Sequence, residues 1–171
     1  MSDTRELGPV IYVSAEAIGQ PGQRRFRLRV MSDAAESASL WLEKEQLNRL
    51  GDAIETVLTD EDYRYSVPPL DDFEAEPVFP LAASVEMHIG QLSMGVNRDT
   101  RRIVLIATDR PDPDEPEGST VSFEFDYRRG YELRQQVINV VAAGRPPCPL
   151  CTAPMAPEGH VCVRSNGHNP H

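Results

Sequence analysis

The sequence predicts an α+β protein with two βββα-type repeats, whose strands form antiparallel sheets packed against two helices, followed by a small zinc-binding hook at the C-terminus. Apolar and polar residues alternate in several short stretches, which is typical of half-buried strands, and two longer stretches have the apolar period of a helix. All three cysteines lie near the end of the chain. We divide the chain into a first βββα half (1–59), an acidic linker (60–80), a second βββα half (81–143) and a zinc-binding tail (144–171).

The first half begins with a short apolar run at residues 10–14, which predicts a strand. A turn follows at residues 19–22, with the sequence GQPG. Residues 25–30 alternate strictly, so one face of this second strand is apolar and the other carries arginines. A third short strand is expected at residues 39–42. From residue 43 the apolar side chains follow the period of a helix that runs to about residue 58.

The region between the two halves is rich in acidic residues and proline, which predicts an exposed linker at residues 60–80. Beyond it, apolar residues alternate at residues 85–89 and again, in the opposite phase, at residues 92–96. The change of phase between these runs predicts a β-bulge or a kink. Residues 97–100 are expected to form a hairpin turn.

The second half continues with an unbroken apolar run at residues 102–107, which predicts a central strand covered on both faces. A further strand is expected at residues 123–127 and a helix at residues 130–143. The order β-β-β-α therefore occurs twice, and residues 101–109 parallel residues 24–33 in sequence. We predict an internal duplication with pseudo-twofold symmetry, and a groove between the halves where a ligand could bind.

The cysteines form the most specific pattern in the chain. Cys148, Cys151 and Cys162 lie within fifteen residues that also contain His160. A two-residue spacer lets the first two sulfurs reach the same point, and the i, i+2 spacing places His160 and Cys162 on one side of an extended segment. Thiolates and imidazole are the ligands of tetrahedral zinc. Four protein ligands leave no position for water, so we expect a structural zinc ion.

This zinc site has four alternatives, one of which, unligated surface cysteines, is uncommon in so tight a cluster. Disulfides are disfavoured because three is an odd number and no apolar N-terminal segment directs the chain to an oxidising compartment. His168 or His171 could replace His160 as the fourth ligand, but both lie near the free end. Zinc deaminases share the first cysteine pair but need an upstream H-x-E, and the only upstream histidine, His88, is followed by Gly90 at the glutamate position.

Arginines on the predicted strands provide a second candidate site. Three of them share one strand face in the first half, and the others lie near strand ends in the second half. The set is Arg25, Arg27, Arg29, Arg101, Arg102, Arg128 and Arg129. If three or more converged on one pocket, they could bind a phosphate bidentately. The alternative is that they form the wet face of a sheet and pair with Glu124, Asp126 and other carboxylates.

Two further side chains lie out of phase with the apolar residues around them. His88 is expected on the outer sheet face, where a histidine is more often structural than catalytic. Trp41 is expected at a helix–sheet or subunit contact. An exposed Trp41 would indicate an interface, and a buried one a second core.

Composition narrows the functional classes. A formal net charge of −10 disfavours nucleic-acid binding, which depends on Lys and Arg contacts with phosphates. No apolar run approaches the roughly 20 residues of a membrane span, so a soluble cytoplasmic protein is expected.

Several stretches together resemble a known family. They are the GQPG turn before Arg25-Phe26, the Arg102-Ile103-Val104 strand, and a tail with CPLC, Pro154, Pro157, GHxC, Arg164 and Asn166-Gly167. This pattern spans nearly the whole chain and is similar to an uncharacterised bacterial domain-of-unknown-function family. Thr152 stands where that family usually has glycine, which removes no ligand. The resemblance implies a soluble bacterial protein without an established activity.

The sequence supports two functional hypotheses. The first is a non-catalytic binding or adaptor protein, in which zinc fastens the tail and residues 164–171 are either presented to a protein partner or frayed. The second is an enzyme or binding protein for a phosphorylated or otherwise anionic small molecule, bound in an arginine-lined groove. No nucleophile elbow, phosphate-binding loop or H-E-x-x-H motif is present. Enzymatic activity, the ligand or partner, and the oligomeric state stay open at this point.

Overall fold

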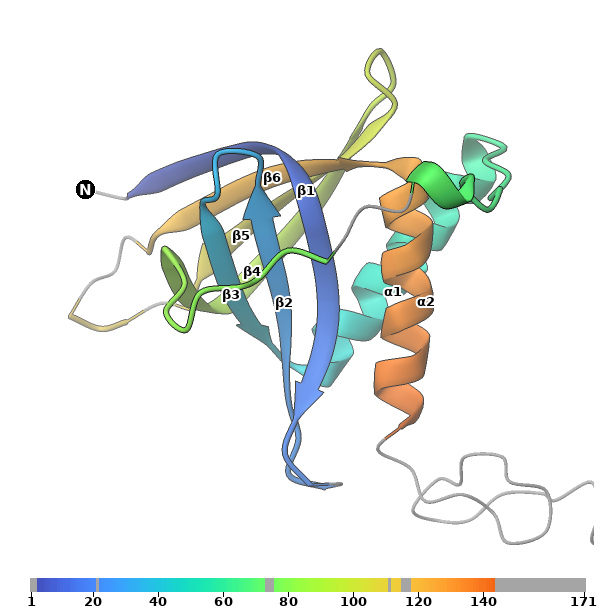
Figure 1. The fold of residues 1–171 in the computed structure, drawn as a ribbon. Coiled ribbons are helices and arrows are strands. Elements are labelled where there is room, and N and C mark those ends of the chain that lie inside the picture. Colours follow the sequence, from blue (N-terminus) through green and yellow to red (C-terminus); the bar gives the residue numbers. More distant parts are fainter. Residues whose placement is uncertain (1–2, 21, 73–75, 111, 115–117, 144–171) are drawn as a thin grey trace, which may run out of the picture.

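The computed structural model describes residues 3–20, 22–72, 76–110, 112–114 and 118–143 (Figure 1). The elements are β1 (Thr4–Ile18), β2 (Arg25–Ser32), β3 (Ser37–Leu42), α1 (Lys44–Asp60), the 3₁₀ turn η1 (Leu70–Asp72), β4 (Val85–Asn97), β5 (Arg102–Asp109), β6 (Thr120–Asp126) and α2 (Tyr127–Ala142). The α+β class is confirmed, and three strands precede each helix as predicted.

The strands form one closed barrel in the order β1-β2-β3-β4-β5-β6, with β6 pairing back onto β1 (Figure 1). Neighbouring strands within each half are antiparallel. By contrast, β3 pairs with β4 in parallel, and β6 pairs with β1 in parallel. The expectation of antiparallel sheets is therefore corrected to one mixed barrel. The parallel pair β3–β4 is sterically accessible because α1 provides the long crossover connection that such a pair needs.

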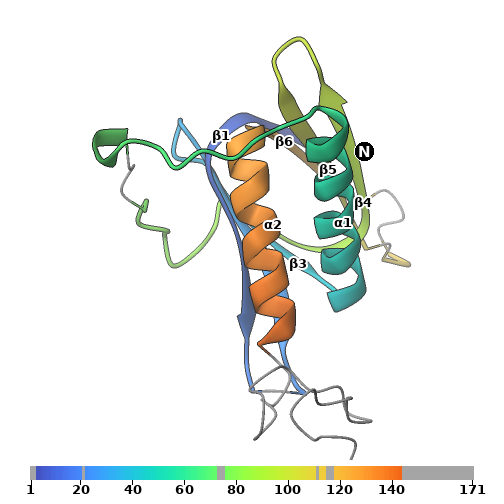
Figure 2. The ribbon, with the colours of Figure 1, turned by 90° about the vertical axis from the view of Figure 1, so that its right-hand side faces the viewer.

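Both helices lie side by side along the barrel (Figure 2), and α2 also packs against β1. Their predicted apolar faces are buried: Leu47, Leu50 and Ile54 in α1, and Leu133 and Val137 in α2. In the described part of the chain, no helix is both long and apolar enough to cross a bilayer.

The barrel interior is filled by side chains. Residues from both halves are fully or almost fully buried there, including Leu28, Val30, Leu40, Ile89, Ile103, Leu105, Val121, Phe123 and Phe125. Small barrels of this kind have interiors just wide enough for their own side chains. Core side chains therefore occupy the barrel interior.

β5 differs from the prediction of a strand covered on both faces. Ile103, Leu105 and Ala107 are fully buried, but Ile106 between them is 42% exposed. A barrel strand has one face toward the core and one toward the surroundings, so only alternate residues of the apolar run contribute to the core.

Several element boundaries also differ from the sequence prediction, and two of them have a clear structural cause. β1 begins at Thr4, well before residue 10, because its first residues pair in parallel with β6. α2 begins at Tyr127 rather than near residue 130, because Asp126 caps it by accepting a hydrogen bond from the Arg129 backbone N–H at 2.8 Å.

The predicted bulge and hairpin turn of the second half are confirmed. The register between β4 and β5 shifts between Ile89 and Gln91. At the following turn, the Asn97 side-chain oxygen accepts hydrogen bonds from the backbone N–H groups of Asp99 and Thr100, at 3.1 and 3.2 Å. The first half has a corresponding shift, between Val10 and Tyr12 in the pairing of β1 with β2.

The predicted linker contacts the barrel and α2. Phe79 lies against Tyr12, with ring centroids 5.0 Å apart, and the Tyr12 hydroxyl donates to Glu76 at 2.7 Å. Nearer α1, Tyr65 stacks on Tyr131 of α2 at 4.3 Å. Figure 1 shows the green segment before β4 crossing the outer face of the barrel. Its described parts are therefore attached to the outer surface rather than free of it.

Candidate functional site

The zinc prediction falls on a part of the chain outside the described residues. Cys148, Cys151, His160 and Cys162 all lie there, as do His168 and His171. Among the residues that the structure does describe, no three His, Cys, Asp or Glu side chains are grouped so as to hold a metal ion. Zinc binding therefore stays a prediction from the cysteine spacing.

The seven candidate arginines do not come together in the described structure. Arg25, Arg27 and Arg29 lie on the outer face of β2, Arg101 and Arg102 lie at the start of β5, and Arg128 and Arg129 lie in the first turn of α2. One surface hollow lies between α1 and α2 and another at the turn between β4 and β5. None of the seven arginines lines either hollow.

In the second half, Arg102 and Arg129 contact nearby carboxylates and a carbonyl, and Arg101 lies over the Tyr127 ring at 5.4 Å. Arg102 forms an ion pair with Glu124 of β6, with a 2.8 Å distance from Nη1 to Oε1. Arg129 donates from Nε to the Ile11 carbonyl at 3.0 Å and also lies beside Asp126. These contacts stabilise the barrel wall and the start of α2.

On β2, two of the three arginines share one carboxylate partner. Glu16 of β1 pairs with Arg27 Nε through one oxygen and with Arg29 Nη1 through the other, the latter at 3.4 Å. The Arg29 guanidinium also lies 3.8 Å from the centre of the Phe79 ring, so it is held between β1 and the segment that crosses the barrel.

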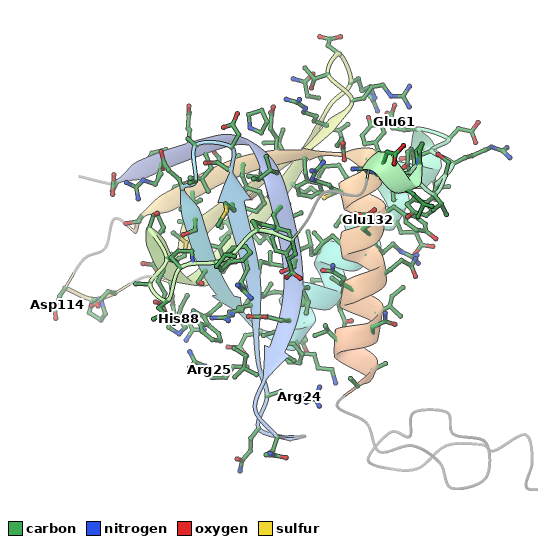
Figure 3. All side chains as sticks on the ribbon, viewed as in Figure 1. Arg24, Arg25, Glu61, His88, Asp114 and Glu132 are labelled. Atoms are coloured by element: carbon green, nitrogen blue, oxygen red, sulfur yellow. The ribbon has the colours of Figure 1, made fainter. Side chains whose placement is uncertain are left out.

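Arg25 has different surroundings. Its guanidinium carbon lies 4.1 Å from the centre of the Trp41 ring, and its Nη2 lies 3.1 Å from Nε2 of His88. Figure 3 shows Arg25 and His88 near each other on the barrel wall. Among the described residues, no carboxylate lies within ion-pair distance of Arg25.

Trp41 forms a fixed platform beneath this arginine. The side chain lies on the outer face of β3 but is only 9% exposed, because Arg25 and Arg27 cover it. Its indole N–H donates to Oε1 of Glu86 at 3.0 Å, and the His88 ring lies nearly parallel to it, with centroids 6.4 Å apart. Trp41 is thus a buried residue of a second, outer layer, which is one of the two outcomes considered from the sequence.

Tyr12 and Tyr127 have raised pKa values and are neutral structural groups. Burial raises the pKa of Tyr127, whose hydroxyl has no hydrogen-bond partner among the described residues. Burial, followed by the hydrogen bond to Glu76, raises the pKa of Tyr12. A phenol with a raised pKa is a weak acid and stays protonated near neutral pH, so neither provides a catalytic tyrosinate.

The sequence placed Arg25, Trp41 and His88 on outer strand faces but did not bring them together. Alternation within each strand was the sequence feature that could locate them, because all three are out of phase with the core residues beside them. The supporting residues Glu16 and Glu86 were not identified, because cross-strand partners depend on the order and register of the strands.

Comparison with known proteins identifies a family. A search of curated proteins and a search of solved structures each gave no match. A family model described as "Protein of unknown function (DUF3090)" matches residues 6–162, a range that includes the barrel, both helices and the cysteine cluster as far as Cys162. The chain therefore belongs to the DUF3090 family.

Proposed function

We propose that the protein is a non-catalytic binding protein in which a structural zinc ion, bound by Cys148, Cys151, His160 and Cys162, fastens the C-terminal segment. The observation that carries this proposal is the clustering of all three cysteines with a histidine in fifteen residues. The matched family range ends at Cys162 and so contains all four of these residues.

A physical argument gives the metal its role. A segment of this length that follows α2 has too few apolar residues to build a core of its own. Metal ligation offsets the entropy lost when such a segment is ordered. The cysteines must be reduced, because zinc binds thiolates and not disulfides. This requirement fits a reducing compartment such as the cytoplasm. A fastened segment could then present residues 164–171 to a protein partner.

The barrel favours a binding site on its outer surface, because core side chains fill its interior. The two halves also have matching strand pairings. Phe26 of β2 is opposite Leu42 of β3, just as Ile103 of β5 is opposite Phe125 of β6. These matches, together with the two corresponding bulges, support the predicted internal duplication, so each surface position in one half has a counterpart in the other.

The direct test of the zinc proposal is the metal content of untagged, freshly reduced protein. We expect about one zinc ion per chain, and Cys162→Ser should lose it, because three ligands bind zinc less tightly than four. The C-terminal segment of this variant should also be cleaved faster by protease, while the barrel stays folded by circular dichroism.

His168→Gln is the matched control, because it removes a histidine near the same end of the chain but outside the proposed ligand set. This variant should keep its zinc. Loss of zinc in His168→Gln with retention in His160→Gln would reassign the fourth ligand. Wild-type protein without bound zinc would overturn the proposal.

A further inference from the structure

Equivalent positions in the two halves can be assigned from the strand pairings. The residue before Phe26 on β2 corresponds to the residue before Ile103 on β5, because Phe26 and Ile103 have equivalent partners on β3 and β6. On the next strand, Trp41 lies opposite His88 of β4, as Glu124 lies opposite Pro9 of β1. The first half therefore has Arg25, Trp41 and His88 where the second half has Arg102, Glu124 and Pro9.

The two sets of residues differ in charge balance. In the second half, the guanidinium of Arg102 is neutralised by Glu124 at 2.8 Å, and Pro9 has no polar side chain. In the first half, an indole takes the place of that carboxylate, and the guanidinium of Arg25 lies over it. The imidazole of His88 contacts Arg25 but adds no negative charge. The position that an ion pair occupies in the second half thus holds, in the first half, an arginine with no carboxylate within ion-pair distance among the described residues.

The Arg25 guanidinium is also held in a fixed orientation before any ligand binds. Cation–π contact with Trp41 restrains its planar guanidinium, and Trp41 is itself held by its hydrogen bond to Glu86. A guanidinium that is already oriented loses less side-chain freedom when it binds a ligand. Both Arg25 and His88 are exposed, so an incoming group can reach their nitrogen atoms.

We infer that Arg25 and His88 bind the phosphate group of a small phosphate monoester on the Trp41 platform. Two guanidinium N–H groups can donate to two phosphate oxygens. A third oxygen remains for the His88 ring, whose Nε2 can donate to it in the tautomer that carries a hydrogen on that nitrogen. A carboxylate has only two oxygens, and the Arg25 fork would occupy both, so phosphate suits the pair of groups better.

Glu86 is a carboxylate beside the Trp41 platform, and its negative charge would oppose this ligand. It lies two residues before His88 on β4, and its Oε1 accepts the indole N–H of Trp41. Replacing it by glutamine removes the negative charge but keeps an oxygen that can accept the same hydrogen bond. Glu86→Gln should therefore bind phosphate monoesters more tightly than the wild type.

This site is independent of the zinc proposal, because it uses residues of β2, β3 and β4 and none of the four zinc ligands. Loss of zinc from Cys162→Ser should leave phosphate binding unchanged. The two proposals can therefore fail separately.

Trp41 makes the test direct, because it is the only tryptophan in the chain. The probes are glycerol 3-phosphate, inorganic phosphate and acetate, each added to the full-length protein at constant ionic strength. We expect a saturable change of tryptophan fluorescence with glycerol 3-phosphate, weaker binding of inorganic phosphate and no saturable change with acetate. Calorimetric titration provides a second readout that does not depend on the environment of the indole.

The variants compare the two halves. Arg25→Gln should weaken glycerol 3-phosphate binding by about tenfold or more, since a charge-assisted bidentate contact is lost. His88→Gln should weaken it less. Arg102→Gln is the matched control: it removes an arginine at the equivalent position of the second half and should leave the affinity unchanged. Circular dichroism of each variant establishes that it is folded.

Three results would overturn the inference. One is equal affinity of the wild type and folded Arg25→Gln. Another is an equal loss in Arg102→Gln, which would show a general effect of net charge. The third is binding of inorganic phosphate but not of glycerol 3-phosphate, which would exclude a monoester as the ligand.

Discussion

The two halves of the barrel have matching backbone pairings but different outer surfaces. Leu28 lies opposite Leu40 in the first half, and Leu105 lies opposite Phe123 in the second, all of them buried. On the outer face, by contrast, the first half has Arg25 stacked on Trp41, where the second has an ion pair of Arg102.

The difference follows from packing. Inward-facing side chains must fill a shared interior at high density, which restricts their size and polarity. Outward-facing side chains meet no such restriction, and an exposed ion pair contributes about 1 kcal/mol or less. Replacing a carboxylate by an indole on the outer face therefore costs the fold little, and it leaves an arginine available for a ligand.

The largest expected effect is on the free energy of unfolding, and it tests whether the two halves share one core. Leu40→Ala and Phe123→Ala remove equivalent buried side chains, one from each half. Each should lower the free energy of unfolding by about 3–5 kcal/mol. Urea unfolding followed by circular dichroism should show a single transition for both variants, because a closed barrel cannot lose half of its strands and remain closed.

This view would be contradicted by two unfolding transitions, one of which has its urea midpoint shifted by Leu40→Ala but not by Phe123→Ala. The two halves would then unfold separately. The conservative variants Leu40→Ile and Phe123→Leu serve as controls, because they preserve most of the buried volume and should be less destabilising.

A smaller effect is expected at the residue that precedes each helix. Asp126 accepts a hydrogen bond from the backbone N–H of Arg129 at the start of α2. Glu43, at the equivalent position before α1, receives its support from Gln46, whose side chain accepts the Glu43 N–H at 2.8 Å. Asp126→Ala should cost about 1 kcal/mol of stability in urea unfolding, because the N-cap acceptor is lost.

Glu43→Ala should cost less, because the alanine keeps the backbone N–H that Gln46 accepts, and the ion pair of Glu43 with Arg110 that it removes is exposed. Asp126→Asn keeps a capping oxygen and should stay close to the wild type. An equal loss of stability in Asp126→Ala and Glu43→Ala would contradict the view that the side-chain cap stabilises α2 more than α1.

The smallest effect concerns the first residue of each helix, which is buried Tyr127 in α2 and exposed Lys44 in α1. Burial raises the pKa of Tyr127 above its ordinary value of 10.0. Folding then favours the neutral phenol, so its contribution to stability is complete below pH 10.0 and is lost as the pH rises through the folded-state pKa.

Tyr127→Phe should therefore change stability little at neutral pH, since the hydroxyl has no hydrogen-bond partner among the described residues. In alkaline solution, it should lose less stability than the wild type. Urea midpoints measured on both sides of pH 10.0 test this, with Tyr65→Phe as a control on an exposed ring. Parallel loss in wild type and Tyr127→Phe would contradict it.

Local patterns predicted much of the fold. The alternation of residues 25–30 placed Phe26, Leu28 and Val30 in the core, where they are buried. The phase change in β4 predicted the bulge between Ile89 and Gln91. These features depend on which face of a strand or helix is apolar, and that is determined by neighbours in the sequence.

Closure of the barrel could not be predicted in this way. The parallel pairing of the start of β1 with β6 joins residues that are far apart in the chain, and nothing in the local pattern of residues 4–9 indicates it. The same limit applied to β5, where a continuous apolar run was compatible with a strand covered on both faces. Only the partners of a strand determine which of its faces is covered.

The sequence by itself determined the succession of strands and helices, the apolar face of each, and the cysteine cluster on which the zinc proposal depends, because these follow from the spacing of residues along the chain. The tertiary structure decided that the strands close into a barrel, that Glu16 pairs with both Arg27 and Arg29, and that Arg25 lies instead on Trp41 beside His88. Those outcomes required the order and register of the strands, since an arginine pairs with whichever side chain the neighbouring strand places beside it.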